Sequence, residues 1–239
     1  YTGTSINFVK QTGRNKTINF TTNGMTKEIL CEQLLFATGR KANTEYLDLE
    51  KVGVKTDKKG FVVVNSEMQT SAPHVWAAGD VIGEPMLETI AAKEGAVAVQ
   101  NAFTSNKKKI NFNEVPSAVF TYPEVARVGL TEAEAVQKGI RCACTTLPFE
   151  LVPKAHVIGD VRGLIKMVVN RETKQILGVH ILAPHAADLI HEGVLAVKNK
   201  LTIDDVIDTV HVFPTLSEAI KLAAQSFYSD VSKLSCCTY

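Results

Sequence analysis

The stretch that decides the fold reads Thr70-Ser71-Ala72-Pro73-His74-Val75-Trp76-Ala77-Ala78-Gly79-Asp80. Its second half predicts a buried strand that stops abruptly at Gly79-Asp80. Such an ending can place a carboxylate at the carboxyl edge of a sheet, where it accepts hydrogen bonds from a ligand's hydroxyl groups while the glycine lets the backbone come close. Most isolated Gly-Asp pairs are turns, so the surrounding residues are what make this pair a candidate ligand site.

Two predicted strands precede this stretch, and a predicted helix follows it. Residues Gln33–Ala37 are apolar enough to predict a strand buried on both faces, and a second strand is predicted over Phe61–Val64. Between Leu87 and Phe103 the apolar residues recur at helical spacing. Gly95 lies inside that predicted helix, where it indicates either a close neighbour or ligand, or an ordinary surface glycine.

The remaining chain divides into two parts with different sequence patterns. The first 30 or so residues alternate apolar and polar side chains around Gly13 and Asn23-Gly24, which predicts an antiparallel meander. From about residue 116 short strands alternate with helices, and two strands flanking residues 170–174 predict a hairpin. Capping boxes are predicted at Thr131, Thr202 and Thr215. We expect a domain boundary near residues 110–115, with an α/β part before it and an α+β part after it.

Composition narrows the class of protein. The chain has 239 residues, a formal net charge of +1 and 45% apolar residues. This balance is typical of a globular protein and argues against a broad nucleic-acid surface, and no apolar stretch is long enough to predict a membrane span. Five thinly spread cysteines fit a reducing cytoplasm better than a secreted disulfide framework. The first residues carry neither an initiator Met nor a signal pattern, so we expect them to lie inside a longer protein.

The motif ending at Asp80 resembles the second FAD-binding motif of the flavoprotein disulfide reductases. Leu35-Phe36-Ala37-Thr38-Gly39-Arg40-Lys41-Ala42-Asn43 is similar to the Ala-Thr-Gly-Arg signature of the same family, and the stretch from Pro116 to Val125 looks like the start of its dimerisation domain. The resemblance implies that Asp80, with Gly79, binds the ribityl chain of FAD. It also implies that Glu88 lies near the flavin, or else is only a first-turn glutamate, and that Gly39-Arg40 lies near NADPH.

The resemblance implies a domain order as well. Residues 1–43 would end the NADPH-binding domain, residues 44–113 would form the second part of the FAD-binding domain, and residues 114–239 would form an α+β dimerisation domain with a C-terminal tail. The expected assembly is therefore a homodimer, with no nucleic-acid or membrane partner.

One segment departs from the common family pattern. Members that act on dithiols carry His-x-His-Pro-Thr-x-Ser-Glu, in which the second histidine is the acid–base group; the segment here is His211-Val212-Phe213-Pro214-Thr215-Leu216-Ser217-Glu218. Phe213 cannot exchange a proton, and His211 lies about 6–7 Å away along an extended chain, too far to substitute for it. The change argues against dithiol substrates and agrees with the mercuric-reductase branch. Phe213 would then line the metal path or simply pack in the core, and Glu218 would only complete a capping box with Thr215.

The C-terminal tail supports the same interpretation as Phe213. Cys236 and Cys237 are adjacent, close to the end of the sequence, where a strained vicinal disulfide would add little rigidity. Soft thiolates suit Hg(II). The pair resembles the tail of the mercuric reductases, which implies that it collects Hg(II) thiolates and delivers the ion from the partner subunit. Cys142 and Cys144, two apart on a predicted strand, are expected to share a packed face rather than bind metal. Cys31 is expected in the core.

Two family features do not occur in the sequence. It contains neither Gly-x-Gly-x-x-Gly nor Cys-x-x-x-x-Cys. We expect the first FAD loop, the NADPH loop and the redox-active disulfide upstream, and we expect these 239 residues alone not to turn over. The alternatives are another flavoprotein disulfide reductase, or a non-catalytic chain that only dimerises or binds metal.

Overall fold

The computed structural model describes residues 1–233, and the chain separates into two compact units, Tyr1–Lys41 and the remainder from Ala42 onward. Within residues 1–233 no helix is both long and apolar enough to cross a membrane. The chain combines helices and sheets, as the sequence predicts.

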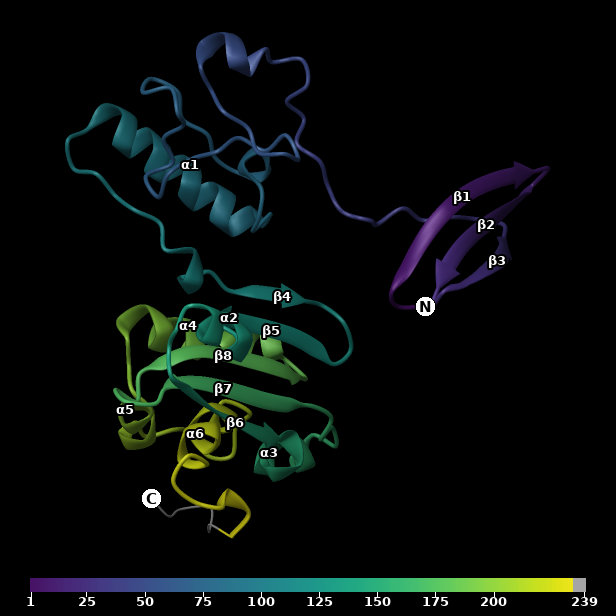
Figure 1. The fold of residues 1–239 in the computed structure, drawn as a ribbon. Helices are drawn as coiled ribbons and strands as arrows, with labels where there is room; N and C mark the ends of the chain where they lie inside the picture. Colours follow the sequence, from purple (N-terminus) through teal and green to yellow (C-terminus); the bar gives the residue numbers. More distant parts are fainter. Residues whose placement is uncertain (234–239) are drawn as a thin grey trace. The chain divides into compact units, whose positions relative to one another are not determined.

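The first unit is an antiparallel meander of three strands (Figure 1): β1 (Thr4–Thr12), β2 (Asn15–Thr22) and β3 (Met25–Cys31). Its turns lie at Gly13 and Asn23-Gly24, which adopt the positive φ angles that tight hairpins need. The predicted meander is therefore confirmed. Cys31, expected in the core, ends β3 and is only half-buried.

The strand predicted over Gln33–Ala37 is wrong for this chain. These residues form no strand, and Leu35 and Phe36 are 89% and 74% exposed. A strand buried on both faces needs neighbouring strands to satisfy its backbone and helices to cover it. No segment among residues 1–233 pairs with Gln33–Ala37.

The part of the second unit before residue 114 is rich in loops. The strands predicted over Phe61–Val64 and His74–Ala78 are reduced to isolated bridges, Thr56 with Val62, Val64 with Thr70 and Gln69 with Trp76. Strands this short have too few ladder hydrogen bonds to extend, so both predictions were too long. Two short 3₁₀ helices, η1 (Leu49–Val52) and η2 (Asp80–Ile82), lie in this part.

Helix α1 (Glu88–Phe103) confirms the predicted helix and organises this part. Its buried face packs into an apolar cluster that includes Met68 and Ile110. Asn101, fully buried on the same face, donates to the carbonyl oxygens of Glu67 and Lys108 and accepts the amide of Lys108. An added Cβ on Gly95 would meet nothing within 4 Å, so no neighbour among the described residues explains this glycine.

A five-stranded antiparallel sheet, ordered β4-β5-β8-β7-β6, follows the short helix η3 (Phe112–Glu114) (Figure 1). Its strands are β4 (Ser117–Val119), β5 (Glu124–Gly129), β6 (Cys142–Pro148), β7 (Leu164–Asn170) and β8 (Ile176–Ala183). The pairing of β7 with β8 across residues 170–174 confirms the predicted hairpin.

Helices cover the two faces of this sheet unequally. The helices α4 (Ala186–Asn199), α5 (Ile203–Asp208) and α6 (Glu218–Gln225) share one large core with the sheet. Helix α2 (Glu132–Gln137) covers a smaller cluster that contains Val168, whose neighbours Met167 and Val169 belong to the large core. Since neighbouring strand residues point to opposite faces, the two cores lie on opposite sides. The remaining short helices are η4 (Phe149–Leu151), α3 (Pro153–Val157) and η5 (Val231–Lys233).

Two of the three predicted capping boxes are confirmed, at Thr131 with Glu134 and at Thr202 with Asp205. The third is half formed. The Thr215 amide donates to the Glu218 carboxylate at 3.2 Å, but the Thr215 hydroxyl donates to the carbonyl oxygen of Val212, and α6 begins at Glu218 after Ser217. Thr215 therefore closes a local turn instead of capping the helix.

Candidate functional site

Gly79 and Asp80 form a tight junction between the Thr70–Ala78 stretch and η2. Gly79 has φ 79° and ψ −161°, a conformation that is open essentially only to glycine. Asp80, the first residue of η2, is half-buried. The backbone turns sharply at this point. Its conformation requires a glycine at position 79, directly before the carboxylate-bearing Asp80.

Glu94 holds this junction from helix α1. Its carboxylate oxygen Oε2 accepts the backbone N–H of Gly79 at 2.7 Å, and the residue is 1% exposed. Burial raises the pKa of Glu94, the Gly79 hydrogen bond lowers it, and the nearby Asp80 carboxylate raises it. A buried acid is thus joined directly to the predicted cofactor motif.

Sequence reasoning missed Glu94, although a signal was present. Glu94 lies four residues after Ile90 and three before Val97, so it occupies the apolar stripe of the helix. A charged residue on a buried helix face needs a partner, because an unpaired buried charge is costly. The other predicted residue of this helix, Glu88, is its exposed first residue, where a glutamate favours the helix dipole.

Gly39 and Arg40 belong to the first unit, in the segment that follows the meander. Gly39 has φ 106°, and both residues are exposed. The positive φ accounts for a glycine at this position. Gly39 and Arg40 therefore lie in one unit while Gly79, Asp80 and Glu88 lie in the other.

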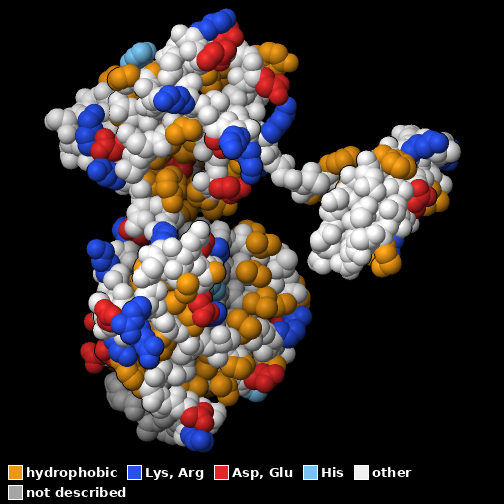
Figure 2. All heavy atoms as spheres, in the orientation of Figure 1, with side chains coloured by type: hydrophobic (Ala, Val, Ile, Leu, Met, Phe, Trp, Pro, Cys, Tyr) orange, Lys and Arg blue, Asp and Glu red, His pale blue; other side chains and the backbone are white. Residues whose placement is uncertain are grey.

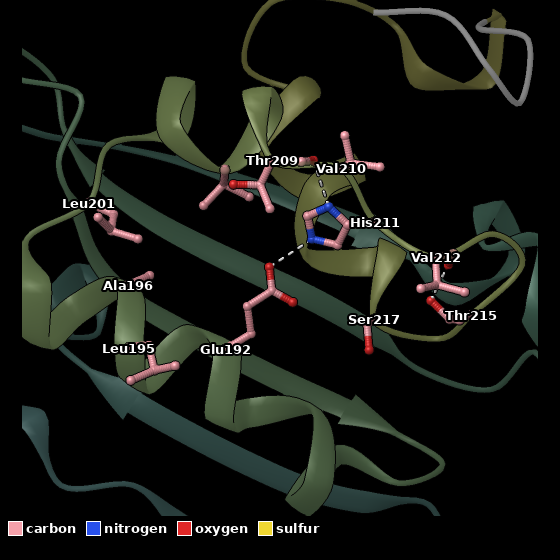
Figure 3. Close-up of a pocket in the computed structure, with 11 residues that line it drawn as sticks. Glu192, Leu195, Ala196, Leu201, Thr209, Val210, His211, Val212, Thr215 and Ser217 are labelled. Atoms are coloured by element: carbon pink, nitrogen blue, oxygen red, sulfur yellow. Dashed lines mark hydrogen bonds and ion pairs between the residues drawn. The ribbon is translucent and has the colours of Figure 1, made fainter.

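The segment His211–Glu218 departs from the common family pattern. Within it, the side chain of His211 rather than that of Phe213 points into the protein. Its Nε2 lies 2.8 Å from Oε1 of Glu192 on α4, and its Nδ1 lies 3.0 Å from the carbonyl oxygen of Thr209 (Figure 3). The imidazole side chain is 8% exposed, so both ring nitrogens are engaged within the protein. His211 fastens the segment to α4 and leaves no ring nitrogen free for a substrate. Glu192 was not singled out from the sequence.

A pocket of about 480 Å³ opens beside this pair. Its walls combine α4 and α5 with the segment before α6, and Figure 3 shows the hydrogen-bonded pair of His211 and Glu192 among the residues that line it. The lining residues are Glu192, Leu195, Ala196, Leu201, Val206, Thr209, Val210, His211, Val212, Thr215 and Ser217.

Phe213 lies outside that lining and is 47% exposed, so it does not pack in the core of this chain. Its role near a metal path stays a prediction. Cys236 and Cys237 lie outside the described residues. Within residues 1–233, no group of three or more His, Cys, Asp or Glu side chains is arranged to hold a metal ion.

Cys142 and Cys144 share one face of β6, as predicted, and pack on the cluster beneath α2. Burial raises the pKa of the Cys144 thiol to about 11, with a further rise from the neighbouring Glu132 carboxylate. Such a thiol is mostly protonated at neutral pH. This agrees with the interpretation of the pair as packing residues.

Residues 1–95 match the family model described as pyridine nucleotide-disulphide oxidoreductase, and residues 115–224 match the model for its dimerisation domain. The chain belongs to the pyridine nucleotide-disulphide oxidoreductase family. The resemblance to flavoprotein disulfide reductases is thereby confirmed. Enzymes of this family use FAD and NADPH.

Similar proteins include members with different substrates. A mercuric reductase of Staphylococcus aureus is 44% identical over 236 residues, which cover 99% of this chain and 43% of that protein. A dihydrolipoyl dehydrogenase of Thermus scotoductus is 42% identical over 92% of this chain and 48% of its own length. The crystal structure of LpdA from Mycobacterium tuberculosis superimposes with a TM-score of 0.83 at 29% identity, over 95% of this chain and 49% of that one. The chain thus spans less than half the length of these proteins.

Proposed function

We propose that this chain forms the C-terminal part of an NADPH-dependent flavoenzyme that reduces Hg(II) to Hg(0) in mercury detoxification. The observation that carries the proposal is the adjacent pair Cys236-Cys237, found together with Phe213 where dithiol-reducing members have histidine. Identity of 44% to a mercuric reductase over nearly the whole chain supports the same assignment.

The residues of the second unit suit the flavin. Asp80 would accept hydrogen bonds from the ribityl hydroxyl groups, and Gly79, in its glycine-only conformation, would let the backbone approach. Glu88, exposed at the start of α1, would lie near the flavin, and Gly39 with Arg40 would contribute on the NADPH side. Bound FAD supplies electron transfer from the nicotinamide to the active-site disulfide that we expect upstream. An Asp80→Ala variant should lose FAD affinity, measured by flavin fluorescence on release.

The tail thiols would deliver the substrate. Hg(II) prefers two nearly collinear soft ligands, so a vicinal pair can accept the ion from a carrier thiol and pass it to inner thiols without releasing it to water. Each transfer exchanges one thiolate for another and keeps the metal two-coordinate. The ion then takes up two electrons to become Hg(0). We propose that the tail serves the active site of the partner subunit in a homodimer.

The test of delivery uses the full-length protein that carries this chain. Hg(II)-dependent NADPH oxidation is measured with a competing thiol present, in the wild type and in a Cys236→Ala/Cys237→Ala variant. A Cys31→Ala variant is the matched control, since that thiol lies at the end of β3. We expect the double variant alone to slow, and equal rates in all three proteins would contradict delivery by the tail. The 239 residues alone should show no turnover.

A second candidate is a disulfide reductase that acts on a small dithiol. The 42% identity to a dihydrolipoyl dehydrogenase favours it. Against this candidate, the chain lacks an acid–base histidine. Phe213 replaces that residue, and both ring nitrogens of His211 are already engaged. Lipoamide-dependent NAD(H) turnover at rates comparable with the mercury reaction would support this candidate and contradict the first.

The dimer is proposed from the match of residues 115–224 to the dimerisation domain. Apolar side chains reach the surface of the unit that contains the five-stranded sheet (Figure 2), and exposed ones include Val119, Phe120, Tyr122 and Val157. Such side chains are typical of an association surface. Light scattering coupled to size-exclusion chromatography should give twice the mass of one chain, and a monomer at micromolar concentration would contradict the proposal.

A further inference from the structure

We propose that Glu94 is a positioning residue of the flavin site, which holds the backbone of Gly79 so that Asp80 faces the cofactor. The inference rests on the proposed function, in which Asp80 binds FAD. Glu94 acts through the main chain and need not touch the cofactor itself.

The backbone conformation of Gly79 needs a partner that holds it in place. Gly79 occupies a region of backbone space that few residues adopt, and such conformations persist only when their surroundings fix them. The hydrogen bond from the Gly79 amide to Glu94 is 2.7 Å long, within the range of charge-assisted bonds. The bonded N–H belongs to the Ala78–Gly79 peptide, so the bond anchors the backbone just before Asp80, and the φ and ψ angles of Gly79 then set the direction in which the Asp80 side chain leaves the chain.

Burying the Glu94 carboxylate on an apolar helix face costs free energy. A carboxylate on the apolar face of α1 must leave water, and burial accordingly raises its pKa. The nearby Asp80 carboxylate raises that pKa further. An apolar side chain would serve packing better at this position. The carboxylate is therefore explained by the Gly79 amide that it accepts and not by the stability of the helix.

Asn101 provides a matched comparison on the same helix. It lies seven residues after Glu94 on the same buried face and is also a buried polar side chain, but it hydrogen-bonds the backbone of Glu67 and Lys108 instead of the predicted cofactor motif. Loss of Asn101 should destabilise the fold without changing Gly79. Loss of the Glu94 acceptor should instead release the Gly79 amide, with little cost to the packing of the helix.

The experiment uses the full-length flavoprotein and measures the FAD dissociation constant by fluorescence, together with the urea midpoint of unfolding. Glu94→Gln keeps an acceptor oxygen, and we expect FAD affinity within about threefold of wild type. Glu94→Met keeps length and helix propensity but removes the acceptor, and loss of one such bond should weaken FAD binding roughly tenfold. Asn101→Leu should lower the urea midpoint while the folded protein keeps its FAD affinity. Equal affinities of the Met and Gln variants would overturn the proposal.

Three further measurements test this inference, and the first of them separates it from the proposed function. If Asp80→Ala leaves FAD affinity unchanged, the proposed flavin contact is wrong; if it weakens binding while Glu94→Met does not, only the role of Glu94 is wrong. A double Asp80→Ala/Glu94→Met variant should bind no more weakly than Asp80→Ala alone, because Glu94 acts through Asp80, and additive losses contradict this. In the wild type the Gly79 amide should resist hydrogen exchange; exchange as fast as in exposed loops would contradict the proposal without any variant.

Discussion

At the scale of single residues, burial decides whether a thiol reacts. The pKa of Cys144 lies near 11 because its sulfur is desolvated beneath α2 and lies beside the Glu132 carboxylate. Its thiolate fraction at pH 7.5 should fall roughly a hundredfold below that of an unperturbed cysteine. We expect iodoacetamide to alkylate Cys144 far more slowly in the native protein than in urea, as quantified by peptide mass spectrometry. Equal rates in the two conditions would contradict the buried, protonated state.

Glu94 should give stability a pH dependence of defined sign. Its pKa is raised in the folded protein, so the folded state holds the proton more tightly than the unfolded state. The stabilising contribution is therefore complete below the unfolded pKa and is lost as the pH rises through the higher folded value. Glu94→Gln cannot titrate. The difference in unfolding free energy, variant minus wild type, should grow as the pH rises from about 4 to neutrality; a difference that shrinks over this range would refute the assignment.

Sequence patterns predict candidate site residues better than they predict the directions of their side chains. The motif makes Gly79 and Asp80 candidates, and Glu94 could have been noticed as a charge in the apolar stripe of a helix. The direction of His211 could not, because its partner Glu192 lies on α4, 19 residues away, and nothing local signals that contact. The third capping box failed for a different, local reason: the Thr215 hydroxyl donates to the carbonyl oxygen of Val212, three residues earlier, in a competing turn.

At the scale of elements, the approach of α4 to the sheet depends on Gly193. A Cβ at this position would lie 3.1 Å from Cβ of Val179 and 3.4 Å from Cγ1 of Val128. Gly193→Val should therefore overpack the core and lower the free energy of unfolding by about 1–3 kcal/mol. Lys198→Val, exposed on the same helix, controls for the helix propensity of valine. Urea denaturation of both variants tests this, and equal midpoints would show that the contact can relax.

The elements predicted correctly are those with local determinants. The β7–β8 hairpin, helix α1 and the two complete capping boxes depend on residues close together in sequence. The strand predicted at Gln33–Ala37 is different, because a strand buried on both faces is stabilised by partners that are distant in sequence. Its apolar composition predicted burial, but Leu35 and Phe36 are exposed, and residues 1–233 supply no strand that pairs with this segment.

At the scale of the whole molecule, the two units differ in how much apolar surface they bury. Within Tyr1–Lys41 the fully buried side chains are Phe20 and Thr22, whereas the five-stranded sheet shares a core of more than twenty buried residues with its helices. Buried apolar area is the main source of stability, and a small sheet without a covered face is marginal. The two units should therefore not unfold as one cooperative structure.

This difference predicts an uneven pattern of hydrogen exchange in the isolated chain. Exposed apolar residues in the meander include Ile6, Phe8, Met25 and Leu30, so local opening of β1–β3 costs little. We expect peptides from these strands to take up deuterium within minutes, while peptides from β7 and β8, in the centre of the sheet, stay protected much longer. Mass spectrometry after timed labelling measures both in one sample. Equal protection of the two sets would mean that the meander draws stability from contacts beyond its own strands.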